Sequence, residues 1–131
     1  MICPQYAACH RTEWLDFDVI CLGGHVSERP HVLDGDEAVE VAQKYQAHKM
    51  FFSLDAITLD GYIHSVHYML YKAMMKSSDE VYLLIDRTKI VTRLDTKLCD
   101  FSALTGVISD FPFPDETKHT YPNVKFICAE E

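Results

Sequence analysis

Three aspartates and one pair of glycines stand directly after apolar runs of the sequence: Asp55, Asp86, Asp110 and the pair Gly23 and Gly24. Short apolar runs are typical of buried strands. Ligands of open α/β sheets bind beyond the carboxyl ends of the strands, where these residues would lie. Carboxylates there can accept hydrogen bonds from sugar hydroxyls, and glycine lets a ligand approach the backbone. The alternative role is structural, because Asp is also a common turn and helix-capping residue.

The segment Asp86-Arg87-Thr88-Lys89 adds positive charge and a hydroxyl to the same edge. Thr88 is suited to the start of a following helix, whose N-terminal N–H groups favour an anion. Lys89 and Arg87 could then neutralise a phosphate or another anionic group. For Arg87 the alternative of a solvated surface pair is the stronger one, whereas Lys89 has apolar neighbours and is the better candidate for binding.

The sequence has none of the common motifs for metals, nucleotides or hydrolysis. His64 and His67 are one helical turn apart, but neither has an Asp or Glu at i+3 or i+4. The five cysteines are scattered without a CxxC pair, which fits reduced cysteines rather than a disulfide framework or a zinc knuckle. GxGxxG, Walker, GxSxG and HExxH patterns do not occur. We therefore expect no catalytic residues, no metal and no cofactor.

Five apolar runs predict the strands of a parallel α/β sheet with flanking helices and right-handed crossovers. The middle three runs are almost continuously apolar, as expected for strands that are buried on both faces. The runs are Phe17–Leu22, Met50–Leu54, Val81–Ile85, Gly106–Ser109 and Val124–Cys128. A further strand-like segment, Met1–Cys3, is abruptly short.

Helical periodicity fills the intervals between these runs. A first helix is predicted over Asp36–Lys49, where Asp34 and Glu37 have the spacing of a capping box. A second has one apolar face, made of Val66, Met69, Leu70, Ala73 and Met74, and a third pattern runs through Ile90, Leu94 and Leu98. Prolines predict a loop over Phe111–Asn123. No linker or repeat interrupts the chain, so residues 1–131 are expected to form a single domain.

The charge of the chain argues against binding to a nucleic-acid backbone. Acidic residues number 20 against 12 basic ones, giving a formal net charge of −8, whereas nucleic-acid affinity rests on clustered Lys and Arg. The N-terminus lacks the basic and apolar regions of a signal peptide, and no run approaches the ~18 apolar residues of a membrane helix. We therefore expect a cytoplasmic protein that does not bind DNA by itself.

The order of these pieces resembles the C-terminal sensor domain of DeoR-family transcriptional repressors. The resemblance covers nearly the whole chain and is carried by the segments DFDVICLGG, DGDEAVEVAQKYQAHKMFFSLDAITLDGYI, KAMMKSSDEVYLLIDRTKI and DFSALTGVISD. Its most specific part is EVYLLIDRTK, which is similar to a D-x-S-K segment after a buried strand. The resemblance implies the fold shared by ribose-5-phosphate isomerase, glucosamine-6-phosphate deaminase and CoA transferases, and a phosphorylated sugar as ligand.

The resemblance also implies which residues form the ligand site. Gly23 and Gly24 match the family's Gly-Gly turn, Asp55 and Gly61 its G-A-D-G-like loop, and Asp86, Thr88 and Lys89 its D-x-S-K. Ser53 and Ala56 stand where that loop usually has glycine, and Cys3-Pro4-Gln5 falls on a Thr-Asn-Ser segment. The resemblance further implies that the winged helix-turn-helix and the first half of the sensor are not among these residues.

We therefore expect the effector-binding domain of a DeoR-type regulator of carbohydrate metabolism, and not an enzyme. Two alternatives remain open: a remnant that acts only as an oligomerisation module, and an isomerase- or deaminase-like enzyme of the same fold. The shortened sensor predicts an open apolar region that is covered in a homo-oligomer. The residues expected nearest that region are Ile2, Val19, Cys21 and Phe52.

Overall fold

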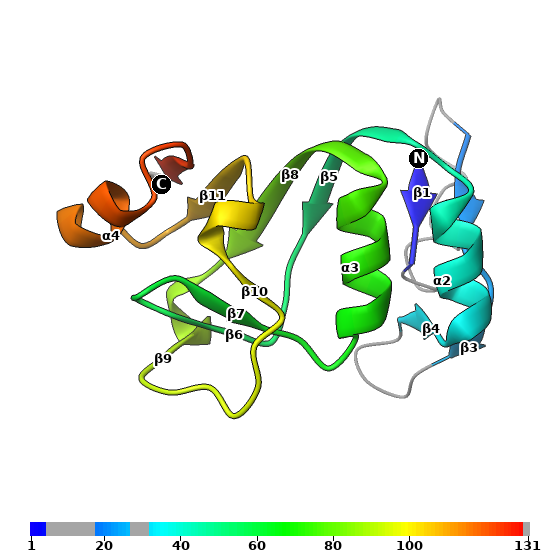
Figure 1. Ribbon diagram of the computed structural model, residues 1–131, viewed down its shortest axis with the longest axis horizontal. Helices are drawn as coiled ribbons and strands as arrows, with labels where there is room; N and C mark the ends of the chain where they lie inside the picture. Colours follow the sequence, from blue (N-terminus) through cyan, green and yellow to red (C-terminus); the bar gives the residue numbers. More distant parts are fainter. Residues whose placement is uncertain (5–17, 27–31, 130–131) are drawn as a thin grey trace. The chain divides into compact units, whose positions relative to one another are not determined.

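The computed structural model describes residues 1–4, 18–26 and 32–129 (Figure 1). The chain divides into two compact units. The smaller unit contains Met1–Gln46 and Met69–Ser77, and the larger contains Ala47–Tyr68 and Ser78–Glu131. None of the helices within the described ranges is long and apolar enough to cross a membrane.

The larger unit is built on a four-stranded parallel sheet with the strand order β12-β11-β8-β5. The strands are β5 (Ala47–Phe52), β8 (Ser78–Ile85), β11 (Gly106–Ser109) and β12 (Lys125–Cys128). β8 pairs in parallel with β5 on one side and with β11 on the other. Four of the five predicted strands are thus confirmed, and the run Val81–Ile85 lies in a central strand.

One face of this parallel sheet forms the core of the larger unit. The buried side chains alternate along the strands, as period 2 requires: Met50 and Phe52, then Val81, Leu83 and Ile85, then Val107. The prediction of burial on both faces is wrong, because Phe51 is 59% exposed and Leu84 is 41% exposed. The apolar runs are continuous without both faces being covered.

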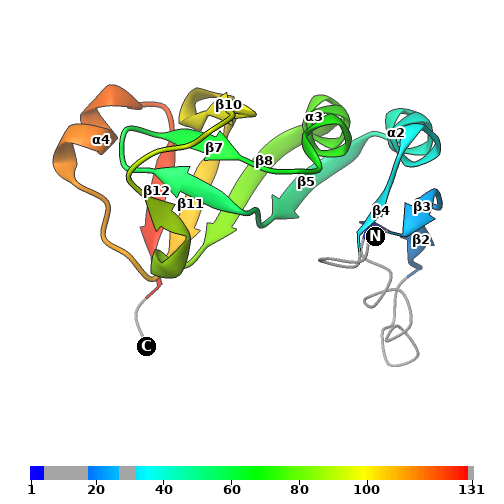
Figure 2. The same ribbon diagram turned by 90° about the horizontal axis from the view of Figure 1, so that it is seen from below.

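A second sheet, with the order β10-β7-β6-β9, lies over the buried face (Figure 2). It consists of β6 (Ala56–Thr58), β7 (Tyr62–His64), β9 (Ile90–Val91) and β10 (Cys99–Asp100). β6 pairs in parallel with β9, and the other pairs are antiparallel. Ile57 and Ile63, both fully buried, point into the core.

The helix predicted through Ile90, Leu94 and Leu98 is wrong. Only one turn of 3-10 helix forms there, η2 (Arg87–Lys89), and the chain becomes extended at Ile90. A second 3-10 turn, η3 (Phe101–Ala103), follows β10. Of the three apolar residues only Ile90 lies in a strand, and Leu94 and Leu98 lie outside helices and strands.

A short helix, α4 (Asp115–Thr120), connects β11 to β12 within the segment predicted as a loop. Pro114 occupies its N-cap, and Asp115 and Glu116 lie in its first turn, where negative charge is favourable. Proline is compatible with a helix start, so the prolines mark the ends of this helix instead of excluding it. α4 is fixed to the second sheet by Thr117, whose hydroxyl donates to the carbonyl of Leu59 at 2.8 Å.

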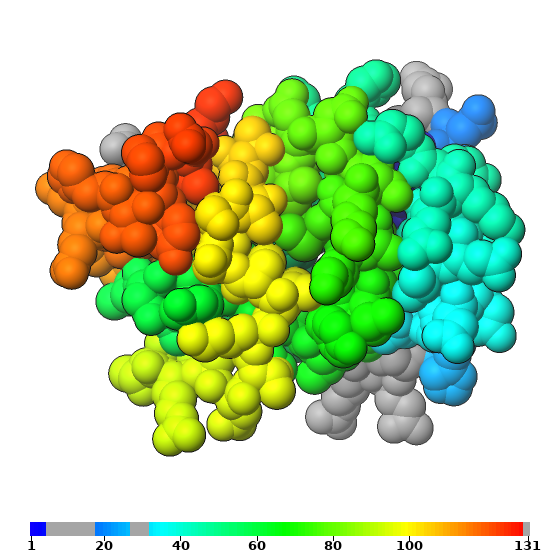
Figure 3. Space-filling view, in the orientation of Figure 1, coloured from blue at the N-terminus to red at the C-terminus, as the bar shows by residue number. Residues whose placement is uncertain are grey.

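Aromatic rings join α4, η3 and the parallel sheet. Phe101 is fully buried and contacts Phe113, Tyr121 and Phe126 with ring centroids 5.5–5.9 Å apart. The segments around α4, η3 and the β6–β7 turn touch one another on this side of the larger unit (Figure 3).

The smaller unit pairs short strands with two helices. β1 (Ile2–Cys3) is parallel to β2 (Ile20–Cys21), and β3 (His25–Val26) is antiparallel to β4 (Leu33–Asp34). The helices are α2 (Asp36–Gln43) and α3 (Tyr68–Lys76). The first residue of α3, Tyr68, belongs to the larger unit, and the rest of α3 belongs to the smaller one. The core is made of Leu22, Val32, Ala38, Ala42 and Leu70.

Both predicted helices of this unit exist, with different ends and faces. α2 ends at Gln43, and β5 already begins at Ala47. Its N-cap is Gly35, and the Asp34 carboxylate accepts a hydrogen bond from the Gly35 N–H, so the predicted capping box is wrong. In α3 the predicted Leu70 and Ala73 are buried, whereas Met69 is 53% exposed.

The N-terminal region was predicted only in part. The short strand near Met1 is confirmed, but of Phe17–Leu22 only Ile20–Cys21 forms a strand, and Phe17 lies outside the described residues. Cys21 is exposed and disulfide-bonded, so the expectation of reduced cysteines is wrong for it.

Candidate functional site

The carboxyl ends of β8 and β11 bring Asp86 and Asp110 to the same edge of the parallel sheet. Ile85 and Ser109 are partners in the strand register, and each aspartate follows its strand directly. The edge is exposed at both carboxylates. Their mutual electrostatic repulsion raises the pKa of Asp86 slightly, against stronger effects that lower it.

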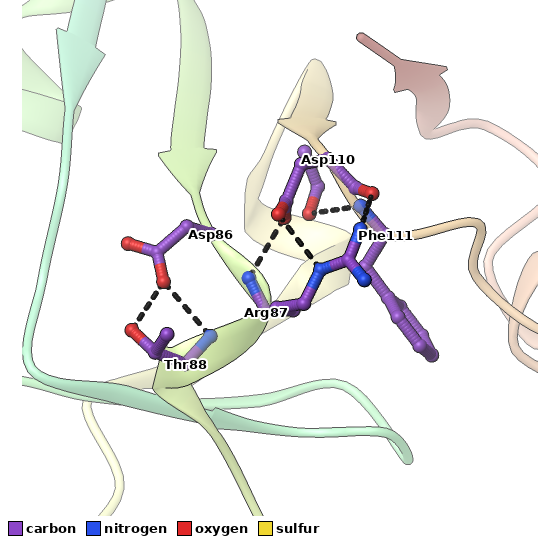
Figure 4. Close-up of polar contacts among 6 residues, drawn as sticks. Asp86, Arg87, Thr88, Asp110 and Phe111 are labelled. Atoms are coloured by element: carbon purple, nitrogen blue, oxygen red, sulfur yellow. Dashed lines mark hydrogen bonds and ion pairs between the residues drawn. The ribbon is translucent and has the colours of Figure 1, made fainter. Parts of the chain in front are cut away.

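Asp86 closes the turn that carries the D-x-T-K segment (Figure 4). Its Oδ1 accepts hydrogen bonds from the Thr88 N–H at 2.8 Å and from the Thr88 hydroxyl. These bonds, the hydroxyl first, lower the pKa of Asp86 below its usual range, and the Lys89 ammonium adds a smaller effect in the same direction. Asp86 is therefore ionised at neutral pH and defines the N-cap of η2.

Arg87 connects this turn to the end of β11. Its backbone N–H donates to Asp110 Oδ1 at 2.8 Å, its Nε donates to Oδ2 at 2.9 Å, and Nη2 donates to the Asp110 carbonyl at 2.9 Å (Figure 4). The bonds from Arg87 lower the pKa of Asp110. The pair is solvated, with side chains 63% and 44% exposed, so the surface-pair alternative for Arg87 is confirmed.

Asp55 precedes a strand that is paired with the segment after the D-x-T-K turn. β6 and β9 are parallel with Ile57 opposite Ile90, so the strand that follows Asp55 is hydrogen-bonded to the strand that follows Lys89. The Asp55 carboxylate is exposed and accepts a hydrogen bond from the Val66 N–H at 3.0 Å through Oδ2. Asp55 precedes β6 and the half-buried Lys89 precedes β9, so these two residues lead into neighbouring parallel strands.

Gly61 has a packing role in the structure. It has a φ of +94°, and a Cβ there would lie 2.4 Å from the Tyr121 ring. The Tyr121 hydroxyl donates to the carbonyl of Asp60 at 2.8 Å, which holds the ring over the β6–β7 turn. Glycine is required here by this close approach; direct ligand contact by Gly61 stays a prediction.

Gly23 and Gly24 lie in the smaller unit, after β2. Both have positive φ values, +74° and +96°, and only Gly24 is crowded, since a Cβ there would lie 2.6 Å from the carbonyl oxygen of Asp34. The two glycines adopt the turn conformation expected for them. Their contribution to the ligand site stays a prediction.

The expected anion site at a helix start is wrong. Both donors of Thr88, its N–H and its hydroxyl, already bind Asp86, and η2 is a single turn. An anion at this edge would have to be bound by Lys89, whose ammonium has no ion pair among the described residues. The carboxylates of Asp55 and Asp86 keep free lone pairs for hydroxyl groups.

The described residues hold no group of three His, Cys, Asp or Glu side chains placed for a metal ion. His64 contacts Thr96, with 2.7 Å between its Nδ1 and the Thr96 hydroxyl. His67 is buried, and its backbone N–H donates a hydrogen bond to the Ser65 hydroxyl.

Sequence reasoning noted Asp110 as an edge carboxylate but missed its pairing with Arg87 and the role of Ser109. The Ser109 hydroxyl accepts a hydrogen bond from the Phe111 N–H at 3.0 Å and shapes the turn after β11. The pairing of Arg87 with Asp110 could have been predicted from the sequence, because the two residues follow two neighbouring strands and their opposite charges therefore come to one edge of the sheet.

A family model described as the DeoR C terminal sensor domain matches residues 6–111. The chain belongs to the DeoR sensor-domain family. Similar curated proteins are the lactose phosphotransferase system repressors of Staphylococcus aureus strains NCTC 8325 / PS 47, N315 and COL. Each is 30% identical over 125 residues, which cover 92% of this chain and 50% of the relative. This DeoR-type chain therefore spans about half the length of these relatives.

Proposed function

We propose that the chain is the effector-binding domain of a DeoR-type transcriptional regulator of carbohydrate metabolism, and that its effector is a phosphorylated sugar. The observation that carries the proposal is the β6–β9 pairing: the strand that follows Asp55 is paired with the strand that follows the D-x-T-K turn, and this turn comes directly after β8 of the parallel sheet. Ligands of open α/β sheets bind beyond the carboxyl ends of such strands. The relatives named as lactose phosphotransferase system repressors support a sugar-derived effector.

Each residue of the turn has a distinct role in this proposal. Asp55 and Asp86 accept hydrogen bonds from sugar hydroxyls, which carboxylates do well because charged hydrogen bonds are strong. Lys89 binds the phosphate as a compact positive charge. Arg87 and Asp110 hold the turn against β11, and Lys89 forms no ion pair with another of the described residues.

The proposal makes the chain a regulator component rather than an enzyme. Its relatives are named as repressors, and we place it, like them, among proteins that act on transcription in the cytoplasm. With a net charge of −8, DNA contact would come from another part of the regulator and not from this chain.

A thermal-shift screen against a panel of sugar phosphates tests the proposal. A ligand at 100 times its dissociation constant adds about 2.7 kcal/mol to the free energy of unfolding, so a binding sugar phosphate raises Tm clearly. The unphosphorylated sugar and inorganic phosphate serve as matched controls and should shift Tm less. The proposal is wrong if no phosphorylated sugar shifts Tm more than these controls.

Two variants locate the site within that screen. Lys89→Met removes the ammonium and keeps most of the side chain, and we expect ligand affinity to fall by roughly ten- to a hundredfold. Lys118→Met on α4 removes the same charge from a lysine that lies 3.4 Å from Asp115, away from the carboxyl edge, and should bind like the wild type. Equal losses in both variants would argue against Lys89 as the anion ligand.

A further inference from the structure

Two cysteines lie opposite each other in the β1–β2 sheet of the smaller unit. Cys3 on β1 and Cys21 on β2 are partners in the parallel register, so their side chains leave the same side of the sheet. Cys3 is a thiol and is buried at 7% exposure. Cys21 is exposed and disulfide-bonded. A thiol and a disulfide therefore occupy neighbouring positions on two paired strands.

The spacing of the two strands suits a direct bond between these cysteines. Neighbouring strands lie about 4.7–4.9 Å apart, and the Cα atoms of a disulfide are usually about 4.4–6.8 Å apart. The register of β1 and β2 thus holds Cys3 and Cys21 at a separation that a disulfide can bridge without moving the strands.

The disulfide of Cys21 is of a kind that exchanges. Exposed disulfides are more easily attacked by a thiolate than buried ones. In a cytoplasmic regulator, which is the proposed function, disulfides are rare and are mostly transient or redox-sensing. Cys99 is a poor competitor as the attacking group, because burial raises the pKa of its thiol to about 11. Cys3 is therefore the thiol best placed to react with Cys21.

A bond between β1 and β2 would act on a sheet that has little other support. The Ile20 N–H donates to the Met1 carbonyl at 2.7 Å, and the Leu22 N–H donates to the Cys3 carbonyl at the long distance of 3.4 Å. Two-stranded sheets are marginally stable by themselves. Because Leu22 leads directly into the turn of Gly23 and Gly24, a covalent bond at Cys21 would fix the strand that carries this turn.

We propose that Cys3 and Cys21 form a thiol–disulfide exchange pair that switches the smaller unit between two covalent states. The Cys3 thiolate attacks the Sγ atom of Cys21, the Cys3–Cys21 bond forms, and the existing disulfide bond of Cys21 breaks. The sulfur that leaves takes up the proton that Cys3 lost, so the step needs no external oxidant or reductant. Its test needs no sugar phosphate, and its failure is therefore distinct from a failure of the proposed function.

Disulfide mapping of the whole chain tests the exchange. The protein is purified without reductant, incubated at about pH 8.5, where thiolates form, alkylated and digested with chymotrypsin, which cuts after the aromatic residues Tyr6 and Phe17 between the two cysteines. Mass spectrometry of the wild type should show the Cys3 and Cys21 peptides joined. The amount formed should not change when the protein is diluted, because the reaction takes place within one molecule.

Two variants and one further measurement complete the test. Cys3→Ser keeps the shape of the side chain and should give no joined peptides, whereas Cys128→Ser removes an exposed thiol of the larger unit and should behave like the wild type. Amide hydrogen exchange at Leu22 should be about tenfold slower in the Cys3–Cys21 form than in the fully reduced chain. The amide of Leu83 in β8 should exchange equally in both forms.

The proposal has clear contrary outcomes. It is overturned if the wild type forms no Cys3–Cys21 bond, or if that bond forms more slowly on dilution. It is also overturned if Cys128→Ser abolishes the bond, or if the bond leaves the exchange of the Leu22 amide unchanged.

Discussion

The D-x-T-K turn is shaped by two carboxylates, each bound by groups of the turn itself. Asp86 binds both donors of Thr88, and Asp110 binds the backbone and side chain of Arg87. The same contacts use up the donors that a helix start would offer to an anion, which leaves Lys89 for that role. The groups that can bind a ligand at this edge are therefore those that form no hydrogen bond within the turn.

The pKa of Asp110 tests the link between Arg87 and β11. Because Arg87 lowers that pKa in the folded chain, the stabilisation is fully present above the ordinary Asp range near ~4. It is lost as the pH falls through the lowered pKa. A carboxyl-carbon NMR titration should show Asp110 titrating below that range.

In the variant Arg87→Gln, the pKa of Asp110 should rise toward its ordinary value. Asp86 is the internal control, since its pKa is lowered chiefly by Thr88 and should remain low. An Asp110 titration that Arg87→Gln leaves unchanged would contradict the hydrogen-bonded link.

Two glycines with positive φ values allow the stability cost of backbone strain to be measured separately from that of crowding. Gly61→Ala places a Cβ 2.4 Å from the Tyr121 ring and should lower the free energy of unfolding by about 2–4 kcal/mol, strain and overpacking combined. Gly23→Ala has a similar φ but no atom within 4 Å of the new Cβ, so about 1–2 kcal/mol is expected. Urea denaturation measures both, and equal losses would mean that the Tyr121 contact is not the constraint.

At the scale of elements, β8 organises the larger unit, because it pairs with strands on both sides and separates the core from the exposed face of the parallel sheet. Two adjacent leucines of β8 test this division. Leu83 is fully buried, and Leu83→Ala should lower the free energy of unfolding by about 2–5 kcal/mol.

Leu84 is 41% exposed on the opposite face of β8, and Leu84→Ala should change the free energy of unfolding by less than about 1 kcal/mol. The comparison is made by urea denaturation at a concentration where the chain is monomeric. Similar losses in the two variants would mean that both faces of β8 are covered in the monomer.

The strands were predictable because their apolar runs are short and strongly patterned, and Gly106–Ser109 matches β11 residue for residue. The segment after β8 was not, since the spacing of Ile90, Leu94 and Leu98 imitates a helix while Asp86 limits the helix to one turn. α4 was missed because its prolines were interpreted as breakers, although Pro114 precedes the helix. Local capping chemistry, which periodicity does not report, decided both cases.

Of the four residues expected nearest an open region, Cys21 is exposed and Phe52 is not. Phe52 was expected in an open region, but it is buried at 6% exposure, and its neighbour Phe51 is the exposed residue. A strand alternates its faces with every residue, so sequence alone did not determine which of two adjacent phenylalanines faces the core. For the ligand site, the residues after β8 and β11 were predicted at one edge, whereas their hydrogen-bond partners required the structure.

At the scale of the whole molecule, a net charge of −8 governs encounters with other polymers. We expect no salt-sensitive binding of this chain to duplex DNA at micromolar protein concentration, because no cluster of Lys and Arg offsets the repulsion. Fluorescence anisotropy with a labelled duplex at low and moderate salt measures this. Binding that weakens steeply as salt is added would contradict the expectation.

The central claim is that a phosphorylated sugar binds at the carboxyl edge of the parallel sheet, and amide NMR tests it most directly. The ¹⁵N-labelled chain is titrated with the sugar phosphate that gives the largest thermal shift, alongside the Lys89→Met variant. The account predicts that the largest shift changes fall on the amides of Asp55, Thr88 and Lys89, and that they are lost in the variant. Changes confined to other residues, or unaltered in Lys89→Met, would contradict it.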